Sequence, residues 1–255
     1  MNSKIDLDRV WDDARAMGSA NRDLLVAIAG MFVLLPGVVA SQLVKLPEEA
    51  PKDLPMEEML RQTMQFYTDN WAVLLGLTLC VSFGLLAMLA LLLRPERLTV
   101  GESLKAALIL LPGYFAATLL QGFGLSVGFM LFFLPGLYLL ARLCLIAPVA
   151  AAEQQVNPLV LLQRSFALTR GNGWRILIML LILYCTGWIV NFVLTRLVGL
   201  IVILLMPKDI AELCVAIASG AVDALLAIFV ALIPAAIYRA KVEPAPTPWL
   251  PDSGI

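Results

Sequence analysis

The chain has 255 residues, of which 61% are hydrophobic and only 15% are charged, and its mean hydropathy is +0.90. Soluble domains carry about a quarter charged residues, so this composition indicates a protein embedded in a membrane. The formal net charge of −1 leaves no excess of Lys and Arg to displace the counterions of a nucleic acid. We therefore expect no nucleic-acid partner.

Catalytic chemistry is limited by the absence of histidine from the chain. That absence excludes His-based acid–base catalysis, His-ligated metal and the nucleophile triads that contain His. The four cysteines lie in or beside apolar runs without CxxC spacing, and we expect them to be buried small hydrophobes. They are Cys80, Cys144, Cys185 and Cys214. We predict no cofactor, no metal site and no catalytic residue, and hence a protein that is not an enzyme.

Residues 3–18 are expected to form an amphipathic helix at the membrane surface. Its apolar residues recur at helical spacing on one face, and Ser3 or Asp6 can cap the first turn. The face consists of Leu7, Val10, Trp11, Ala14 and Met17. Such a helix either lies on the headgroups or packs against the protein's own loops, and the pattern does not separate these alternatives.

Six apolar runs are long enough to cross a hydrocarbon core of about 30 Å at a rise of about 1.5 Å per residue. We place them at about 24–44, 71–93, 106–122, 127–151, 174–194 and 213–238. The third and fourth belong to one long apolar stretch, which we divide at Gly122, Gly124 and Gly128 because glycine adopts turn conformations freely. Residues 1–241 are then one all-α integral membrane domain, a six-transmembrane-helix bundle, and the proline-rich residues 242–255 are a disordered tail.

Short helices and kinks are expected around these spans. Residues 56–67 have helical spacing within the polar loop 45–70, and residues 153–173 contain a second surface helix whose apolar stripe is Leu159, Leu162 and Phe166, widened by Leu161 and Leu168. Residues 197–206 are too short to cross and are expected to extend the fifth helix rather than dip into the leaflet. Three prolines should kink the third and fourth spans. They are Pro112, Pro135 and Pro148. Three units, each a short amphipathic helix followed by two spans, suggest a weak internal repeat.

Lys and Arg are divided unequally between the two sides of these spans. The larger group is Lys4, Arg9, Arg15, Arg22, Arg94, Arg97, Lys105, Arg164, Arg170, Arg175, Arg239 and Lys241, and the smaller is Lys45, Lys52, Arg61, Arg196 and Lys208. Positive residues collect on the cytoplasmic side of membrane proteins. Both termini are therefore predicted to be cytoplasmic.

Arg142 is the one charged residue in the apolar run 106–152. An arginine at mid-span costs about 2.5–3.5 kcal/mol on insertion scales, so it should face the bundle interior or reach toward the headgroups. Glu153 and Asp223 are its candidate intramembrane partners. Two interpretations stay open: a structural ion pair that joins two helices, or a fixed cation that binds a lipid phosphate or an anionic solute.

Asp223 and the basic residues beside the spans each have a functional and a structural interpretation. Asp223 is either a proton-coupling carboxylate or a hydrogen-bonding helix contact beside small residues. Arg164, Arg170 and Arg175, together with Arg94, Arg97 and Lys105, would form a basic collar for anionic headgroups. The same residues also fit ordinary positive-inside topology.

A pattern of residues around this segment resembles a known family. The chain reads Pro135–Gly136–Leu137–Tyr138–Leu139, then Arg142, Pro148, Glu153, Arg164–Ser165, Leu168–Thr169–Arg170–Gly171 and Trp174. It resembles the YciC-like group of bacterial inner-membrane proteins, which is related to the membrane domain of some glycerophosphoryl diester phosphodiesterases. The resemblance covers a short part of the chain and implies a six-span bundle in the inner membrane. It does not imply phosphodiesterase activity, because the catalytic histidines and metal-binding acids of the separate soluble barrel have no counterpart here.

These observations favour a non-enzymatic inner-membrane component in membrane lipid organisation or envelope homeostasis, with membrane lipids as its partners. The alternative is a small transporter or lipid flippase for an anionic substrate, which requires Arg142 and Asp223 to line one continuous polar cavity. A membrane enzyme acting on lipids is the weakest hypothesis, because the sequence has no His, no acids at metal-ligand spacing and no serine elbow.

Overall fold

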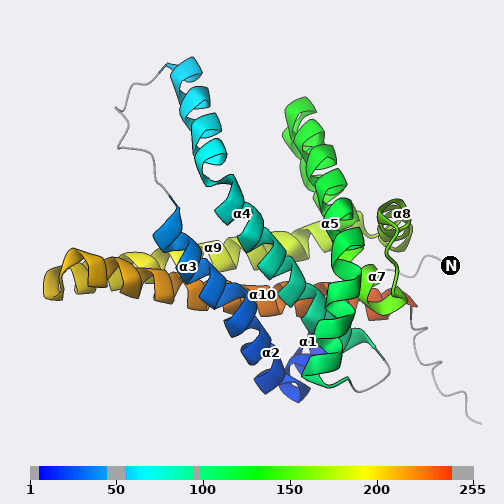
Figure 1. Cartoon of the computed structure of the whole chain (residues 1–255). Helices are drawn as coiled ribbons and strands as arrows, with labels where there is room; N and C mark the ends of the chain where they lie inside the picture. The colour runs from blue at the N-terminus through cyan, green and yellow to red at the C-terminus, as the bar shows by residue number, and fades with distance from the viewer. Residues whose placement is uncertain (1–5, 45–54, 95–97, 243–255) are drawn as a thin grey trace, which may run out of the picture.

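The computed structural model describes residues 6–44, 55–94 and 98–242, and all regular secondary structure in these ranges is helical (Figure 1). The elements are α1 (Leu7–Ala20), α2 (Arg22–Ala29), the π-helical turn η1 (Gly30–Leu34), α3 (Leu35–Leu43), α4 (Met56–Leu93), α5 (Val100–Leu131), α6 (Phe133–Leu143), α7 (Ile146–Glu153), α8 (Pro158–Leu168), α9 (Gly173–Leu205) and α10 (Lys208–Val242). The expected cap Ser3, the irregular half of the loop 45–70, Arg97 and nearly all of the predicted tail lie outside the described residues.

Six stretches of helix are long and apolar enough to cross a membrane. They are Arg22–Leu43, Met56–Leu93, Val100–Leu131, Phe133–Glu153, Gly173–Val202 and Ile210–Val242. The chain is therefore a polytopic all-α membrane protein, as its hydropathy predicts, with the short helices α1 and α8 beside the long ones.

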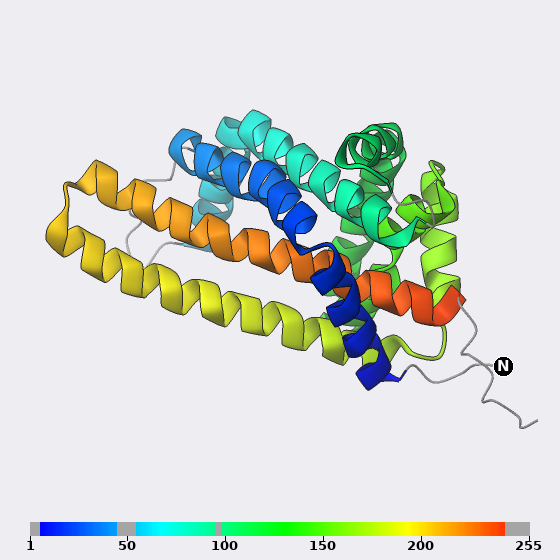
Figure 2. The same cartoon turned by 90° about the horizontal axis from the view of Figure 1, so that it is seen from below.

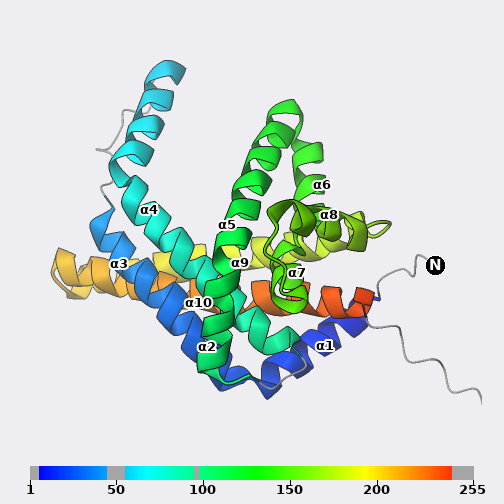
Figure 3. The same cartoon turned by 45° about the vertical axis from the view of Figure 1, so that its right-hand side comes forward.

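The six spans form three hairpins that meet at one end of the molecule and spread apart toward the other (Figures 1 and 3). We call the meeting end, where α1, α7 and α8 lie, the packed end. The opposite end, with the tips at Leu43, Leu131 and Leu205, is the open end. Figure 2 shows α9 and α10 side by side along their whole length, with α1 crossing α10 near the packed end.

The packed end holds the hydrophobic core because its helices carry small residues there. Ala87 and Ala90 of α4, Ala107 of α5, Ala150 of α7 and Ala235 of α10 are all fully buried. Small side chains let helix backbones approach closely, which is the main source of helix association in a membrane. Toward the open end the large apolar side chains of the same helices are mostly exposed.

The predicted break at Gly122–Gly128 is wrong. The α5 helix continues through these glycines to Leu131, and the chain reverses at Phe132, whose φ of −162° and ψ of 150° are extended. The glycines instead allow close packing, since a Cβ on Gly128 would lie 3.1 Å from the Cα of Gly136 in α6. The third and fourth spans are therefore Val100–Leu131 and Phe133–Glu153, rather than 106–122 and 127–151.

The separate surface helix predicted at 56–67 is also wrong, because it is the first part of α4. Nothing between Met56 and Leu93 breaks the helix, which has 38 residues and a length of about 57 Å at 1.5 Å per residue. That exceeds a hydrocarbon core of about 30 Å, so α4 projects beyond it. Residues 197–205 continue α9 as helix, as the expected extension requires, and Met206 ends it with extended backbone.

Prolines explain two irregularities in the spans. Pro36 has no N–H, and in a regular α-helix its ring would clash with the carbonyl of Phe32. The turn before it widens into η1, where the Leu35 N–H donates to the Gly30 carbonyl. Pro148 stands in the same relation to Cys144, where the fourth span is interrupted between α6 and α7. Pro135 lies in the first turn of α6, and α5 continues through Pro112.

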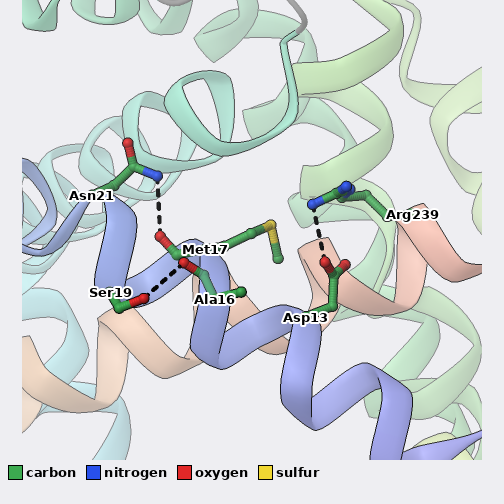
Figure 4. Close-up of polar contacts among 6 residues, drawn as sticks. All are labelled: Asp13, Ala16, Met17, Ser19, Asn21 and Arg239. Carbon is green, nitrogen blue, oxygen red and sulfur yellow. Dashed lines mark hydrogen bonds and ion pairs between the residues drawn. The ribbon is translucent and has the colours of Figure 1, made fainter.

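The α1 helix packs on α10 rather than on loops. Asp13 accepts a hydrogen bond from Arg239 at 3.1 Å (Figure 4), and the Cβ position of Gly18 lies 3.0 Å from Leu232. The predicted cap Asp6 accepts from the Asp8 N–H. Val10, Ala14 and Met17 are buried, as the pattern predicts, whereas Leu7 and Trp11 at the start of that face are exposed.

The cysteines depart from their expected burial. All four are free thiols, but Cys185 is exposed and Cys80, Cys144 and Cys214 are only half-buried. Cys80, Cys185 and Cys214 lie on apolar helices and Cys144 lies between α6 and α7, and partial exposure to hydrocarbon costs a weakly polar thiol little.

Candidate functional site

The interruption between α6 and α7 is closed by two hydroxyl groups from α8 and the residue that follows it. The buried Ser165 donates to the carbonyl of Arg142 at 2.8 Å and accepts from the N–H of Leu145 at 3.3 Å. Thr169, also buried, lies 3.3 Å from the same carbonyl. A broken helix frees backbone groups that hydrocarbon cannot satisfy, and these side chains supply the partners.

Sequence analysis missed the role of Ser165 and Thr169. Their signal was two hydroxyl residues four positions apart on a helix that begins soon after the fourth span. The predicted stripe of α8 is shifted accordingly, because Leu161 and Ser165 are buried while Leu159 is exposed. The α8 helix therefore serves to hold the α6–α7 interruption in place.

Arg142 lies at this interruption, with its guanidinium between two aromatic rings. The guanidinium carbon is 5.2 Å from the centroid of Phe166 and 5.9 Å from that of Tyr138, distances at which a cation is attracted to a ring face. Tyr138 also approaches the ring of Trp174, with centroids 6.2 Å apart. Within the described residues no carboxylate lies within 4.0 Å of Arg142. We call Arg142, Tyr138, Phe166 and Trp174 the Arg142 cluster.

Neither candidate partner pairs with Arg142, which corrects that prediction. Glu153 accepts from Arg164 at 2.8 Å and from the hydroxyl of Tyr238 at 3.1 Å, so it joins α7, α8 and α10. Glu153 follows Arg142 by eleven positions, which would place the two on one face of a continuous helix, but the helix is interrupted between α6 and α7. Arg164, predicted as a lipid-binding residue, is thus partly neutralised by Glu153, although 44% of its side chain remains exposed.

Of the other predicted lipid-binding residues, Arg170 lies in the turn 169–173 at the packed end and Arg175 lies just after it in α9. Gly171 takes a positive φ of 80° in this turn, and Gly173 begins α9 with its Cβ position 2.8 Å from the ring of Tyr138. Both arginines are exposed. The turn therefore places them on the segment that contacts the Arg142 cluster. Another member of the predicted collar, Arg94, donates to the carbonyl of Ala151 at 3.4 Å.

Asp223 belongs to a separate network between α9 and α10. It accepts from the side-chain amide of Asn191 at 2.7 Å, and Ser219 donates to the amide oxygen of Asn191 at 3.3 Å. This arrangement fits the interpretation of Asp223 as a hydrogen-bonding helix contact. Asp223 is nevertheless exposed rather than sealed within the bundle.

Two hollows lie along the α9–α10 hairpin. One, of about 1040 Å³, lies at the open end between α3, α9 and α10, and its lining includes Asn191, Arg196 and Ser219. The other, of about 430 Å³, lies between α1, α9 and α10, and its lining is apolar apart from Thr186 and Gly187. Arg142 lines neither hollow. The structure thus brings Arg142 and Asp223 into different surroundings.

Comparison with known proteins finds no matching family model, no matching curated protein and no matching solved structure. The functional assignment therefore depends on the geometry described above.

Proposed function

We propose that the protein is a non-enzymatic component of a bacterial inner membrane that organises lipid, and that the Arg142 cluster binds an anionic headgroup. The observation that carries the proposal is that Arg142, half-buried in a membrane span, has two aromatic neighbours and no carboxylate within 4.0 Å among the described residues.

A cation in such a place needs a compensating anion. Unpaired charge within a span is costly, and both acids that the sequence offered as partners are bound elsewhere. Lipid phosphate is the anion that a membrane supplies, and a guanidinium binds phosphate through two parallel hydrogen bonds. The rings of Tyr138 and Phe166 hold the guanidinium beside α8 and the turn 169–173. Arg170 on this turn and Arg175 at the start of α9 add attraction for an anionic surface.

The proposed orientation places the packed end at the cytoplasmic face. The Lys and Arg residues of the larger group that the structure describes lie in α1 and in the segments that join or end the spans at this end. Membership of the YciC-like group is also part of this proposal, and it is supported by the position of three residues that belong to the resemblance. Arg142, Ser165 and Thr169, which carry the resemblance, meet at a single helix interruption.

Native mass spectrometry tests the headgroup site. The protein is reconstituted with an equal mixture of phosphatidylglycerol and phosphatidylcholine, extracted gently and weighed with its bound lipid. We expect the wild type to retain phosphatidylglycerol, and Arg142→Gln to lose most of that preference. Ser165 bonds to the backbone carbonyl of Arg142, so the substitution leaves that bond available. Arg61→Gln is the control, because Arg61 is an exposed arginine of α4 far along the chain from the cluster. Equal retention by all three proteins would refute the proposal.

The alternative function is transport or flipping of an anionic substrate, and the geometry supports it less well. That function requires Arg142 and Asp223 on one polar path. Arg142 contacts α8, whereas Asp223 contacts α9, and neither of the two hollows is lined by Arg142. A path through this bundle would need a rearrangement of the hairpins.

A further inference from the structure

The hollow at the open end is unusual because polar side chains from three apolar helices line it. Ser41 and Gln42 come from the end of α3, Asn191 and Arg196 from α9, and Glu212 from α10. The two α3 side chains bond to each other at 3.3 Å. Ionisable groups inside membrane spans, such as Arg196 and Glu212 here, are costly and often mark binding or conduction sites.

Arg196 is the cationic side chain in the lining of this hollow, and Glu212 is the acidic one. Its guanidinium carbon lies 5.3 Å from the ring centroid of Phe192, and Phe192 stacks on Trp188 with centroids 5.6 Å apart. Although Glu212 lines the same hollow, no described carboxylate lies within 4.0 Å of Arg196. The side chain therefore lies against Phe192 and forms no ion pair with any carboxylate among the residues that the structure describes.

The size and remaining lining of the hollow indicate what would pair with Arg196. About 1040 Å³ is far more than a bare phosphate fills and is at the upper end of the range for small-molecule sites. Trp188, Leu200 and Val215 make much of the surface apolar, and the flanks of α9 beyond it carry exposed leucine and valine. A ligand with a phosphate and an attached apolar chain satisfies both parts of this surface, whereas a free anion satisfies only one.

We infer that the open-end hollow binds a phospholipid, with the phosphate at Arg196 and the acyl chains along α9 and α10. This site is independent of the proposed function, because it lies at the opposite end of the molecule from the Arg142 cluster and would take lipid from the other leaflet. The amide and hydroxyl groups of Gln42, Asn191 and Ser219 surround the headgroup.

Site-resolved photolabelling tests the inference. The full chain is reconstituted with a phospholipid whose acyl chain carries a diazirine, and in parallel with a diacylglycerol that has the same chain and no phosphate. Labelled peptides are mapped by mass spectrometry. We expect the phospholipid to label the segment 188–219 in preference to the diacylglycerol. Arg196→Gln should lower that labelling about tenfold, which corresponds to one lost charge-assisted hydrogen bond, and Arg196→Lys should retain most of it.

The controls separate this site from alternatives. Arg61→Gln removes an arginine that is already paired with Glu58 at 2.7 Å and should leave the labelling unchanged. Arg142→Gln should also leave it unchanged, so failure of the headgroup site at the packed end does not affect this result. Equal labelling by the two probes, or no response to Arg196→Gln, would overturn the inference. Competition by millimolar inorganic phosphate would overturn it too, because the hollow would then be a site for a free anion.

Discussion

The two ends of this molecule differ in what their residues do. At the packed end, alanines are fully buried and the polar groups bond across helices, as Glu153 does with Arg164 and Tyr238. At the open end the three hairpins separate, expose large apolar side chains and leave a polar hollow around Asn191 and Arg196. The difference indicates that folding stability is concentrated where the hairpins meet, while the separated ends offer surface to lipid.

The largest expected effect comes from adding one methyl group at Gly113 in the middle of α5. A Cβ there would overlap the backbone carbonyl of Val156, which cannot rotate away as a side chain can. We expect Gly113→Ala to destabilise the protein by about 3 kcal/mol, measured as a fall in its melting temperature in detergent. Gly101→Ala, in the same helix with open space around its Cβ position, should be neutral or slightly stabilising. Similar melting temperatures for the two variants would contradict the packing of residues 154–157 on α5.

Ser165→Ala should have the next largest effect. It leaves the Arg142 carbonyl with only the longer bond to Thr169, and leaves the buried Leu145 N–H without its hydroxyl acceptor. The expected loss is about 1–3 kcal/mol of unfolding free energy, measured by denaturant titration in detergent. Ser126→Ala is the matched control, because Ser126 is exposed and bonds only to the Gly122 carbonyl of its own helix. Equal losses would show that the interruption does not depend on α8.

The ion pair between Glu153 and Arg164 should contribute less. Both side chains are partly exposed, so solvent screening limits the expected coupling in a double-mutant cycle with Glu153→Gln and Arg164→Gln to about 0.5–1 kcal/mol. The pair Glu58–Arg61 on the exposed start of α4 should show no measurable coupling. A larger coupling for Glu58–Arg61 than for Glu153–Arg164 would show that ion pairs stabilise the open end more than the packed end, which contradicts the difference described above.

The smallest effect is expected at Asn191. Interhelical hydrogen bonds in membrane proteins contribute about 0.6 kcal/mol on average, so Asn191→Leu should lower thermal stability only slightly. A melting temperature lower than that of Ser165→Ala would show that the α9–α10 network, rather than the packed end, supports the fold.

The sequence predicts the number of spans and their class well, because hydropathy and length are additive properties of a local window. It predicts the turn between the third and fourth spans poorly. Gly122, Gly124 and Gly128 have the composition of a turn, yet Gly128 serves helix packing against Gly136, and only the partner helix reveals this.

The candidate site shows the same limit. Arg142 can be selected from sequence because a charge in an apolar run is conspicuous. The neighbours of Arg142 cannot be predicted from sequence, because Phe166 and Ser165 contact it only when α8 folds back onto the α6–α7 interruption. The pairing of Glu153 with Tyr238 joins residues 85 positions apart, which no local spacing predicts.

The π-helical turn η1 also has a consequence for related chains. A π turn holds one residue more than the α-helical turn it replaces, so the residues after Leu34 are rotated by about 100° from the phase that a continuous α-helix would give them. Deleting one residue from Gly30–Leu34 would therefore return this turn to α-helical geometry while α2 and α3 keep the faces that they now present. A homologue one residue shorter at this point would keep the same faces, and an alignment that places the gap elsewhere would misalign every residue between that position and η1.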